Sequence, residues 1–295
     1  MTNNTLVLFD GLSIAYRYAA VIQKHPSNPF ITSTGINTTV PYGIARTVAM
    51  ILTKMYPTHM AVIWDPPGLT WRHELYPEYK AGRTVPGDDF YEQVNTAYNL
   101  LQTWGVYTTA FSPLEADDVI GILAKKAEAE GFDVRIVTKD KDFAQLVSDR
   151  VKLLDTGDKL GESAFTHVTR SMVFEKFHVW PEQIPDYLAL VGDSADNIPG
   201  VKNIGKKIAA ELLLEYENIA GIVANADKLG GVKKKLFKDE QVLKRLELDK
   251  KLTTIPTNIA LPVTLDQLKT PAITQDFIDA LNTLELRSVK KLLGV

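Results

Sequence analysis

The chain has 295 residues, of which 45% are hydrophobic and 23% charged, and its formal net charge is −3. This length can bury a sizeable core, and the composition is that of an ordinary globular protein. The absence of cysteine excludes disulfides and thiolate zinc sites, and it fits a reducing compartment. No stretch has the character of a signal peptide or a membrane span, so we expect no membrane partner.

The first half of the chain alternates short apolar runs with segments of helical periodicity. The apolar runs predict strands over residues 6–9, 60–64, 106–110, 134–138 and 151–155. The periodic segments predict helices over residues 13–23, 42–55, 89–104 and 116–130. Ser13 is the expected N-cap of the first helix, and residues 25–40 are expected to form a loop. Strands separated by helices indicate βαβ units and a mostly parallel sheet.

From about residue 169 onward the pattern becomes mainly helical. Helices are predicted over residues 181–190, 204–214, 219–224 and 240–252. We therefore expect an α/β unit over residues 1–168 and a helical subdomain over residues 169–295.

Nine acidic residues fall into short clusters, most of which directly follow an apolar run. They are Asp10, Asp65, Glu115, Asp117, Asp118, Asp140, Asp142, Asp193 and Asp196. Sites in parallel sheets form beyond the carboxyl ends of the strands, so most of these acids are expected to meet at one edge. Carboxylates gathered in space repel one another unless cations are present, and hard oxygen ligands suit Mg²⁺ or Mn²⁺. The pattern indicates a two-metal phosphoryl-transfer enzyme.

Each cluster also has a local interpretation that needs no metal. Asp10-Gly11 and Asp65-Pro66 are common turn pairs, and acids at 117–118 complement the positive end of a helix. Asp140 and Asp142 would suit a solvated loop, and Asp196 a turn before a proline. Each local interpretation is favoured by itself, but all of them together require coincidence at five places.

The basic residues point to a polyanionic substrate. Setting the nine acids aside leaves 27 acidic against 33 basic residues. Residues 71–83 mix aromatic with cationic side chains, which suits contact with phosphates and bases, although an exposed amphipathic helix is the alternative. Residues 198–207 open a helix with a glycine-bounded hairpin, where backbone N–H groups and lysines suit a phosphate. The lysine run at 233–238 is by default a solvated face.

Taken together, these motifs resemble the 5′ nuclease domain of bacterial DNA polymerase I and, more broadly, the flap endonucleases. The resemblance is carried by FDGLS, PTHMAVIWD, YPEYKAGR, LEADDVIG, KDKDFAQLV and LVGDSADNIPGVKNIGKK. It implies a PIN-like α/β nuclease fold with a helical arch over residues 70–88. It also implies a helix-hairpin-helix element, the helix-three-turn-helix, near residues 192–215.

The resemblance also implies roles for individual residues. Asp10, Asp65, Glu115 and Asp117 match a first metal cluster, Asp140, Asp142, Asp193 and Asp196 a second, and Asp118 is a further candidate ligand. Tyr79, Lys80 and Arg83 match catalytic residues of the arch, with Lys80 near the scissile phosphate. Contacts with DNA are expected from Arg72, Gly200, Val201, Lys202, Ile204, Gly205, Lys206 and Lys207. The family often binds K⁺ at this hairpin, and Asn203 stands where it commonly has glycine, although Asn tolerates positive φ.

The implied activity is that of a cytoplasmic, monomeric, Mg²⁺-dependent 5′ nuclease of DNA replication and repair, in which Mn²⁺ substitutes for Mg²⁺. Two metal ions would serve in-line attack of water on the phosphodiester of branched or 5′-flap DNA. A polymerase would act with it in cis or in trans. The alternatives are a non-catalytic module that binds branched nucleic acid and a PIN-like ribonuclease.

Overall fold

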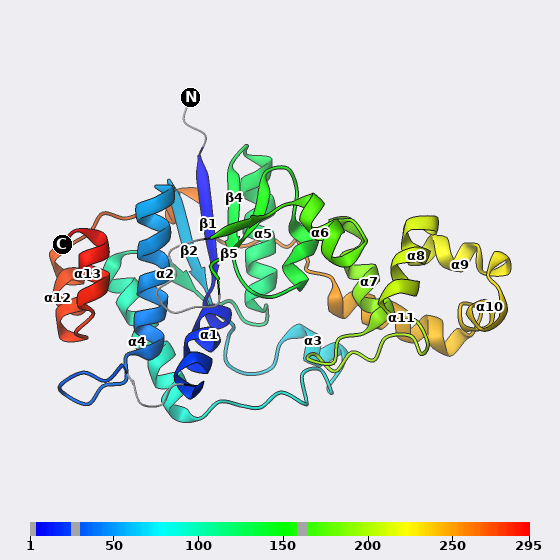
Figure 1. Ribbon diagram of the computed structural model, residues 1–295, viewed down its shortest axis with the longest axis horizontal. Coiled ribbons are helices and arrows are strands. Elements are labelled where there is room, and N and C mark those ends of the chain that lie inside the picture. The colour runs from blue at the N-terminus through cyan, green and yellow to red at the C-terminus, as the bar shows by residue number, and fades with distance from the viewer. Residues whose placement is uncertain (1–3, 25–29, 158–164) are drawn as a thin grey trace.

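A six-stranded sheet forms the centre of the computed structural model, which describes residues 4–24, 30–157 and 165–295 (Figure 1). The strands are β1 Thr5–Asp10, β2 His59–Ile63, β3 Tyr107–Thr109, β4 Asp133–Val137, β5 Val151–Asp155 and β6 Thr166–Val168. Their order is β3-β2-β1-β4-β5-β6, and the first five are parallel. The predicted parallel sheet is therefore confirmed, and the short β6 adds an antiparallel edge.

The central strands are buried on both faces, as expected when helices cover both sides of a parallel sheet. Along β1, Leu6 and Leu8 join one hydrophobic core, whereas Val7 and Phe9 join the other. Helices of the α/β unit are α1 Gly11–Lys24, α2 Thr39–Met55, α3 Trp71–Leu75, α4 Asp88–Trp104 and α5 Ala116–Ala129. Helix α5 packs on the first core, and α1, α2 and α4 pack on the second.

The predicted N-cap Ser13 is wrong, because α1 begins two residues earlier, at Gly11. Strand β1 runs directly into the helix, and the carboxylate of Asp10 accepts the Ser13 backbone N–H at 3.0 Å. Gly11 lies so close to the Trp64 ring that a Cβ there would come within 2.6 Å of it. The acid that ends the strand therefore also caps the helix.

Two connecting segments differ from expectation. Of the loop expected at residues 25–40, residues 25–29 lie outside the described residues, and α2 already begins at Thr39. In residues 70–88, where a helical arch is implied, α3 has only five residues and is followed by turns.

The helical part extends to one side of the sheet (Figure 1). Its helices are α6 Arg170–Phe177, α7 Ile184–Val191, α8 Lys206–Tyr216, α9 Ile219–Ala224, α10 Gly231–Leu236 and α11 Glu240–Thr253. Short 3₁₀ helices are η1 Asp142–Leu146, η2 Pro181–Gln183, η3 Ala226–Lys228 and η4 Leu265–Leu268. None of the helices among the described residues has the length and apolar character needed to span a membrane.

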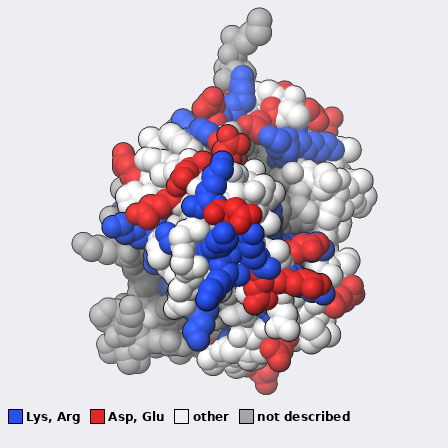
Figure 2. All heavy atoms as spheres, turned by 90° about the vertical axis from the view of Figure 1, so that its right-hand side faces the viewer, with Lys and Arg blue, Asp and Glu red and all other residues white. Residues whose placement is uncertain are grey.

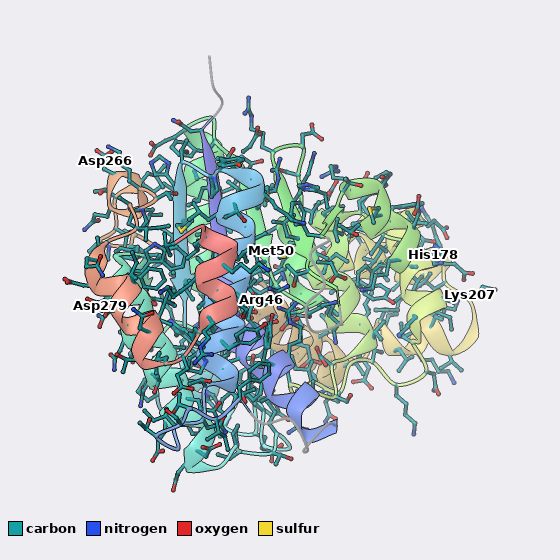
Figure 3. All side chains as sticks on the ribbon, turned by 60° about the vertical axis from the view of Figure 1, so that its left-hand side comes forward. Arg46, Met50, His178, Lys207, Asp266 and Asp279 are labelled. Carbon is teal, nitrogen blue, oxygen red and sulfur yellow. The ribbon has the colours of Figure 1, made fainter. Side chains whose placement is uncertain are left out.

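The last two helices, α12 Gln275–Thr283 and α13 Arg287–Leu293, return to the α/β unit. Helix α13 lies along α2, beside Arg46 and Met50, and α12 packs against α4 (Figure 3). Phe277 of α12 is fully buried and stacks on Trp104 of α4 with ring centroids 4.3 Å apart. The expected helical subdomain of residues 169–295 therefore does not pack as one unit, because α12 and α13 contact the α/β unit.

Residues 192–205 join α7 to α8. The first part of this loop is closed by paired backbone hydrogen bonds between Asp193 and Ile198, of 2.7 and 2.8 Å. A Cβ on Gly200, whose φ is +67°, would meet the backbone nitrogen of Gly192 at 2.4 Å. Both glycines are required by this close backbone approach, which fixes the loop that carries Asp193 and Asp196.

If α12 belongs to the core, Phe277→Ala should lower the free energy of unfolding by about 3–5 kcal/mol, since it removes a fully buried ring. Phe277→Leu should cost less, and exposed Asp279→Ala should change stability by no more than about 0.5 kcal/mol. Urea unfolding measures all three. An unchanged main transition for Phe277→Ala would show that α12 does not contribute to the core.

Candidate functional site

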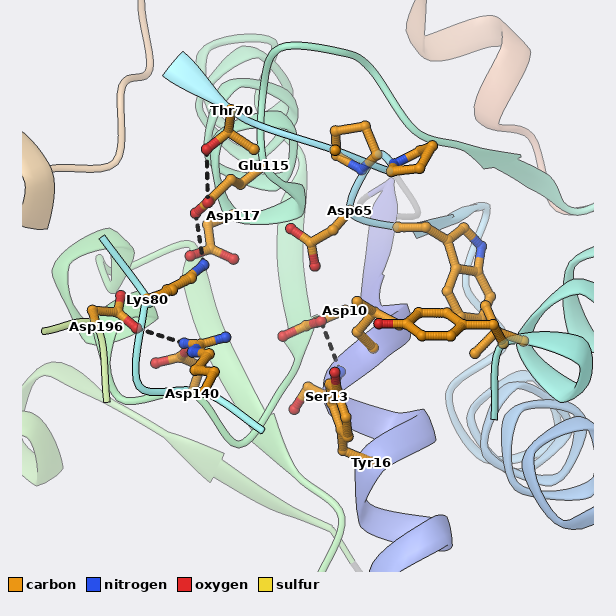
Figure 4. Close-up of a pocket in the computed structure, with 18 of the residues that line it drawn as sticks. Asp10, Ser13, Tyr16, Asp65, Thr70, Lys80, Glu115, Asp117, Asp140 and Asp196 are labelled. Atoms are coloured by element: carbon orange, nitrogen blue, oxygen red, sulfur yellow. Dashed lines mark hydrogen bonds and ion pairs between the residues drawn. The ribbon is translucent and has the colours of Figure 1, made fainter. Parts of the chain in front are cut away.

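Four acidic residues, three after strands and one in a helix, meet at one edge of the sheet. Asp10 ends β1, Asp65 follows β2, Asp140 follows β4, and Asp117 lies in the first turn of α5. The three strands are neighbours in the sheet, so their carboxyl ends lie side by side. These acids line an open pocket of about 870 Å³ together with Lys80, Glu115 and Asp196 (Figure 4). The predicted convergence of acids is confirmed.

The first group of acids consists of Asp10, Asp65 and Asp117, none of which has an ion pair with a described cation. Asp10 accepts the Thr138 hydroxyl at 2.8 Å, and Asp65 accepts the Ala116 N–H at 3.0 Å. Burial, and then the charge of Asp65, raise the pKa of Asp10 to about 7. Burial and the neighbouring Asp140 raise the pKa of Asp117 well above its ordinary value. Divalent cations would relieve this repulsion.

The second group consists of Asp142, Asp193 and Asp196, each with a carboxylate oxygen within 4.8 Å of the others. The Asp142 Oδ1 is buried without a hydrogen-bond partner in the part of the chain described. Burial and Asp140 raise the pKa of Asp142 well above its usual range. A donor set of carboxylate oxygens alone, with one of them unpartnered, fits a hard divalent cation.

Asp140 connects the two groups. Its charge raises the pKa of both Asp10 and Asp142, and its own pKa is raised by burial and by Asp196. Its Oδ1 accepts the backbone N–H of Asp142 at 2.9 Å. The division of the acids between two metal ions stays a prediction, with Asp140 at the boundary.

Protein cations neutralise the remaining carboxylates. The Lys80 Nζ lies 3.0 Å from Glu115, Arg83 lies 2.5 Å from Asp196, and the Lys141 Nζ lies 2.7 Å from Asp193. Burial would raise the pKa of Glu115, but the charge of Lys80 and then of Arg72 holds it below its ordinary value. Lys141 was not among the predicted residues, although its place between Asp140 and Asp142 could have indicated it.

Tyr79 supports the acids from behind and does not line the pocket. Its ring is buried, and its hydroxyl lies 2.9 Å from Asp196 and 3.2 Å from Glu115. Burial and the charge of Glu115 raise its pKa, so the phenol stays protonated and donates. The sequence did not single out Thr70 and Thr138, whose hydroxyls bond Glu115 and Asp10.

Arg72 and Asp118 do not act as predicted. Arg72 is only 2% exposed, so the expected contact with DNA is wrong. Its guanidinium lies 2.8 Å from the Asp118 Oδ1 and 3.2 Å from Glu115, and its Nε donates to the Leu252 carbonyl. Asp118 is fully buried, also accepts the Trp71 indole N–H and the Glu115 backbone N–H, and does not line the pocket.

These contacts fasten residues 70–83 across the acids and onto α11. Arg245 of α11 stacks on the Tyr76 ring at 4.4 Å, and Tyr79 packs with Ile198 and Leu252. Arg83 also donates to the Ala195 carbonyl at 3.2 Å. This segment, which we call the strap, is therefore anchored on both the α/β unit and the helical part.

Aromatic side chains also line the pocket. Tyr16, Trp64 and Tyr91 line it, and the Tyr16 ring stacks on Phe90 with centroids 4.8 Å apart. Tyr16 and Tyr91 are each more than two-fifths exposed. An open pocket that combines carboxylates with exposed rings has room for a phosphate that is attached to a base.

The hairpin residues divide into a buried and an exposed set. Val201 and Ile204 are buried, and their backbone N–H groups bond the Leu190 and Val201 carbonyls, so they position the hairpin. Lys202, Gly205, Lys206 and Lys207 are exposed. Asn203 has φ +67°, which confirms that Asn accommodates the left-handed conformation here.

Comparison with known families covers nearly the whole chain. Residues 5–178 match the 5′-3′ exonuclease N-terminal resolvase-like domain, and residues 179–276 match the 5′-3′ exonuclease C-terminal SAM fold. DNA polymerase I of Mycobacterium bovis is 35% identical over 97% of this chain and 31% of its own length. DNA polymerase I of Bacillus caldotenax is 37% identical over 89% of this chain and 29% of its own length. The chain therefore spans less than a third of these relatives.

Solved structures show the same fold. The zinc-bound T5 5′-exonuclease superimposes with a TM-score of 0.69 at 20% identity, covering 99% of both chains. Flap endonuclease-1 from Methanococcus jannaschii gives a TM-score of 0.64 at 19% identity and covers 99% of this chain and 91% of its own. These likenesses confirm the PIN-like fold expected from the sequence.

The raised pKa of Asp10 predicts how the metal-free protein responds to pH. The folded state holds a proton up to about pH 7, whereas the unfolded state loses it near 3.8, the ordinary pKa of an aspartate. Stability in chelator should therefore fall as the pH rises from about 4 to 7. Thermal unfolding at pH 5.5 and 8 measures this change, and Asp10→Asn should reduce it. An equal pH dependence in Asp10→Asn would show that Asp10 is not its source.

Proposed function

The chain belongs to the 5′-3′ exonuclease family, and on that premise we propose that it is a structure-specific 5′ nuclease. Its substrate is branched or 5′-flap duplex DNA, and it hydrolyses one phosphodiester bond as a flap endonuclease and 5′-3′ exonuclease. One observation carries the proposal: the acids of three neighbouring strand ends and the α5 N-terminus line one open pocket. The polymerase I relatives support a role in replication and repair and a polymerase acting in cis or in trans.

Carboxylate oxygens alone supply the ligands, which favours Mg²⁺, with Mn²⁺ as a substitute. Asp10, Asp65, Glu115 and Asp117 would hold one ion, and Asp142, Asp193 and Asp196, with Asp140 at the boundary, would hold the other. Divalent ions at these acids would supply an activated water and neutralise charge on the phosphate. Glu115 stays ionised beside Lys80 and would complete the ligand set on the α5 side.

Lys80 is the residue of the strap best placed to contact the phosphate. Its ammonium lines the pocket beside Glu115, and the charges of the surrounding carboxylates keep it protonated although burial opposes this. It can donate a hydrogen bond to a phosphate oxygen, where negative charge develops. Arg83, which also lines the pocket, can exchange Asp196 for a phosphate. Tyr79 positions the acids, and Arg72 with Asp118 holds the strap to α5.

Recognition of the duplex is assigned to the hairpin. Lys202, Lys206 and Lys207 are exposed there, and the first backbone N–H groups of α8 are available to a phosphate. Contacts of this kind read the backbone and carry little base specificity. Asn203 adopts the left-handed conformation that the hairpin turn requires. We therefore include K⁺ binding at this turn in the proposal.

The main test is cleavage of a 5′-flap duplex with and without Mg²⁺. Wild-type enzyme should cleave the DNA flap only with metal, whereas Asp140→Asn should bind the flap and leave it intact. An intact substrate at high wild-type concentration would contradict catalysis and leave a binding module. Preferred cleavage of a matched RNA flap would favour a ribonuclease.

Replacement of Lys80 tests its contact with the phosphate. Lys80→Ala should slow the single-turnover step by about 10²–10³-fold, because one donor to the developing charge is lost. Lys80→Arg should retain part of the rate, and Lys125→Ala, a remote exposed lysine of α5 paired with Glu128, is the matched control. A near-native rate for Lys80→Ala would exclude Lys80 from the chemistry.

A further inference from the structure

The helical part carries a surplus of positive charge that the hairpin does not account for. Residues 200–238 contain eight lysines and four acids, in a chain whose net charge is −3. Three of the lysines belong to the hairpin. The other five, which we call the tip lysines, are Lys228, Lys233, Lys234, Lys235 and Lys238.

The tip lysines are presented by a well-anchored element. Phe237, directly after α10, is 1% exposed, and Leu229, directly after η3, is 8% exposed. Both belong to the same core as α7 and α8. The backbone that carries the lysines is therefore fixed relative to the hairpin.

The tip lysines have fewer acidic partners than positive charges. Asp227 is shared by Lys234, at 3.0 Å, and Lys238, at 2.6 Å. Within the described chain, Lys228, Lys233 and Lys235 have no ion pair. Helix α11 differs, since its exposed Lys244 and Lys251 pair with Glu240 and Glu247 one turn away. A helix face that is only exposed to solvent typically alternates acidic and basic residues, as α11 does. The tip has no such alternation.

The tip lies at the end of the molecule, beyond α8 and α9 (Figure 1). Figure 2 looks onto this end and shows Lys and Arg side chains gathered in the middle of the face. Helix α8 begins at the hairpin and has 11 residues, a length of about 16 Å. A ligand that reaches both the hairpin and the tip must therefore be long and negatively charged.

We propose that the tip lysines bind the phosphate backbone of duplex DNA beyond the part held by the hairpin. This inference rests on the proposed function, because it takes the hairpin as the first duplex contact. Duplex DNA is stiff and carries phosphates at regular spacing, so it supplies charge at a distance where a short oligonucleotide does not. The tip then sets the length of duplex that the enzyme prefers. Its contacts add affinity without reading sequence.

The test compares flap substrates whose duplex arms span half a turn and two turns, about 5 and 20 base pairs. The dissociation constant is measured against salt concentration, in chelator, for wild-type enzyme and for Lys233→Ala/Lys235→Ala. With the long arm, the double variant should bind on the order of tenfold more weakly, and its salt slope should fall by about two. The loss should be much smaller with the short arm. The matched control is Lys244→Ala/Lys251→Ala, which removes two exposed, paired lysines of α11.

Equal losses with both arms would overturn the proposal, because the lysines would then act near the hairpin or through the fold. Unchanged affinity with both arms would also overturn the proposal. The tip would then either bind an acidic protein or only face solvent. Circular dichroism of the double variant checks that it is folded, and Lys233→Glu/Lys235→Glu should enlarge the long-arm loss. Metal-dependent cleavage by the wild-type enzyme is scored separately, so the proposed function can stand where the tip proposal fails.

Discussion

Repulsion among carboxylates is the constraint on which this structure depends. The sheet delivers Asp10, Asp65 and Asp140 to one edge, and α5 adds Asp117. Burial makes their shared negative charge unfavourable, as the raised pKa of Asp10 shows. A fold that kept such a site only for stability would pair each acid with a cation. Here the innermost acids lack such partners among the described residues, which is the arrangement expected where metal ions complete the charge balance.

The strap shows how the rest of the charge is balanced. Lys80 and Arg83 neutralise Glu115 and Asp196 on the pocket side, and Arg72 neutralises Asp118 from the buried side. The buried Arg72 also donates to the Leu252 carbonyl at the end of α11. The same residues therefore join the α/β unit to the helical part and hold the acids in place. A change in the strap will act on the fold and on the site together.

The sequence was sufficient to predict the strands and the position of the acids at their ends. Apolar runs located five strands, and acids that follow parallel strands must share an edge, so the pocket could be predicted without coordinates. Side-chain pairing could not be predicted in this way. Arg72 lies in an exposed-looking basic segment, and only the three-dimensional structure brings it against Glu115 and Asp118. The return of Phe277 to Trp104 was missed for the same reason, because it joins segments far apart in the chain.

Asp117 and Asp118 show how one dipeptide performs two tasks. Adjacent residues on a helix do not face the same way, so Asp117 lines the pocket while Asp118 is buried on Arg72. The loop after α7 also performs two tasks, because it carries two of the acids and leads into the hairpin lysines. Gly192 and Gly200 close it so tightly that Asp193 and Asp196 are fixed in the acid cluster. The same turn leads into the exposed lysines of the hairpin, only a few residues away. If the hairpin binds duplex DNA as proposed, the bound duplex would act on the backbone that carries the second group of acids, and this would link the recognition of DNA shape to the geometry of the site.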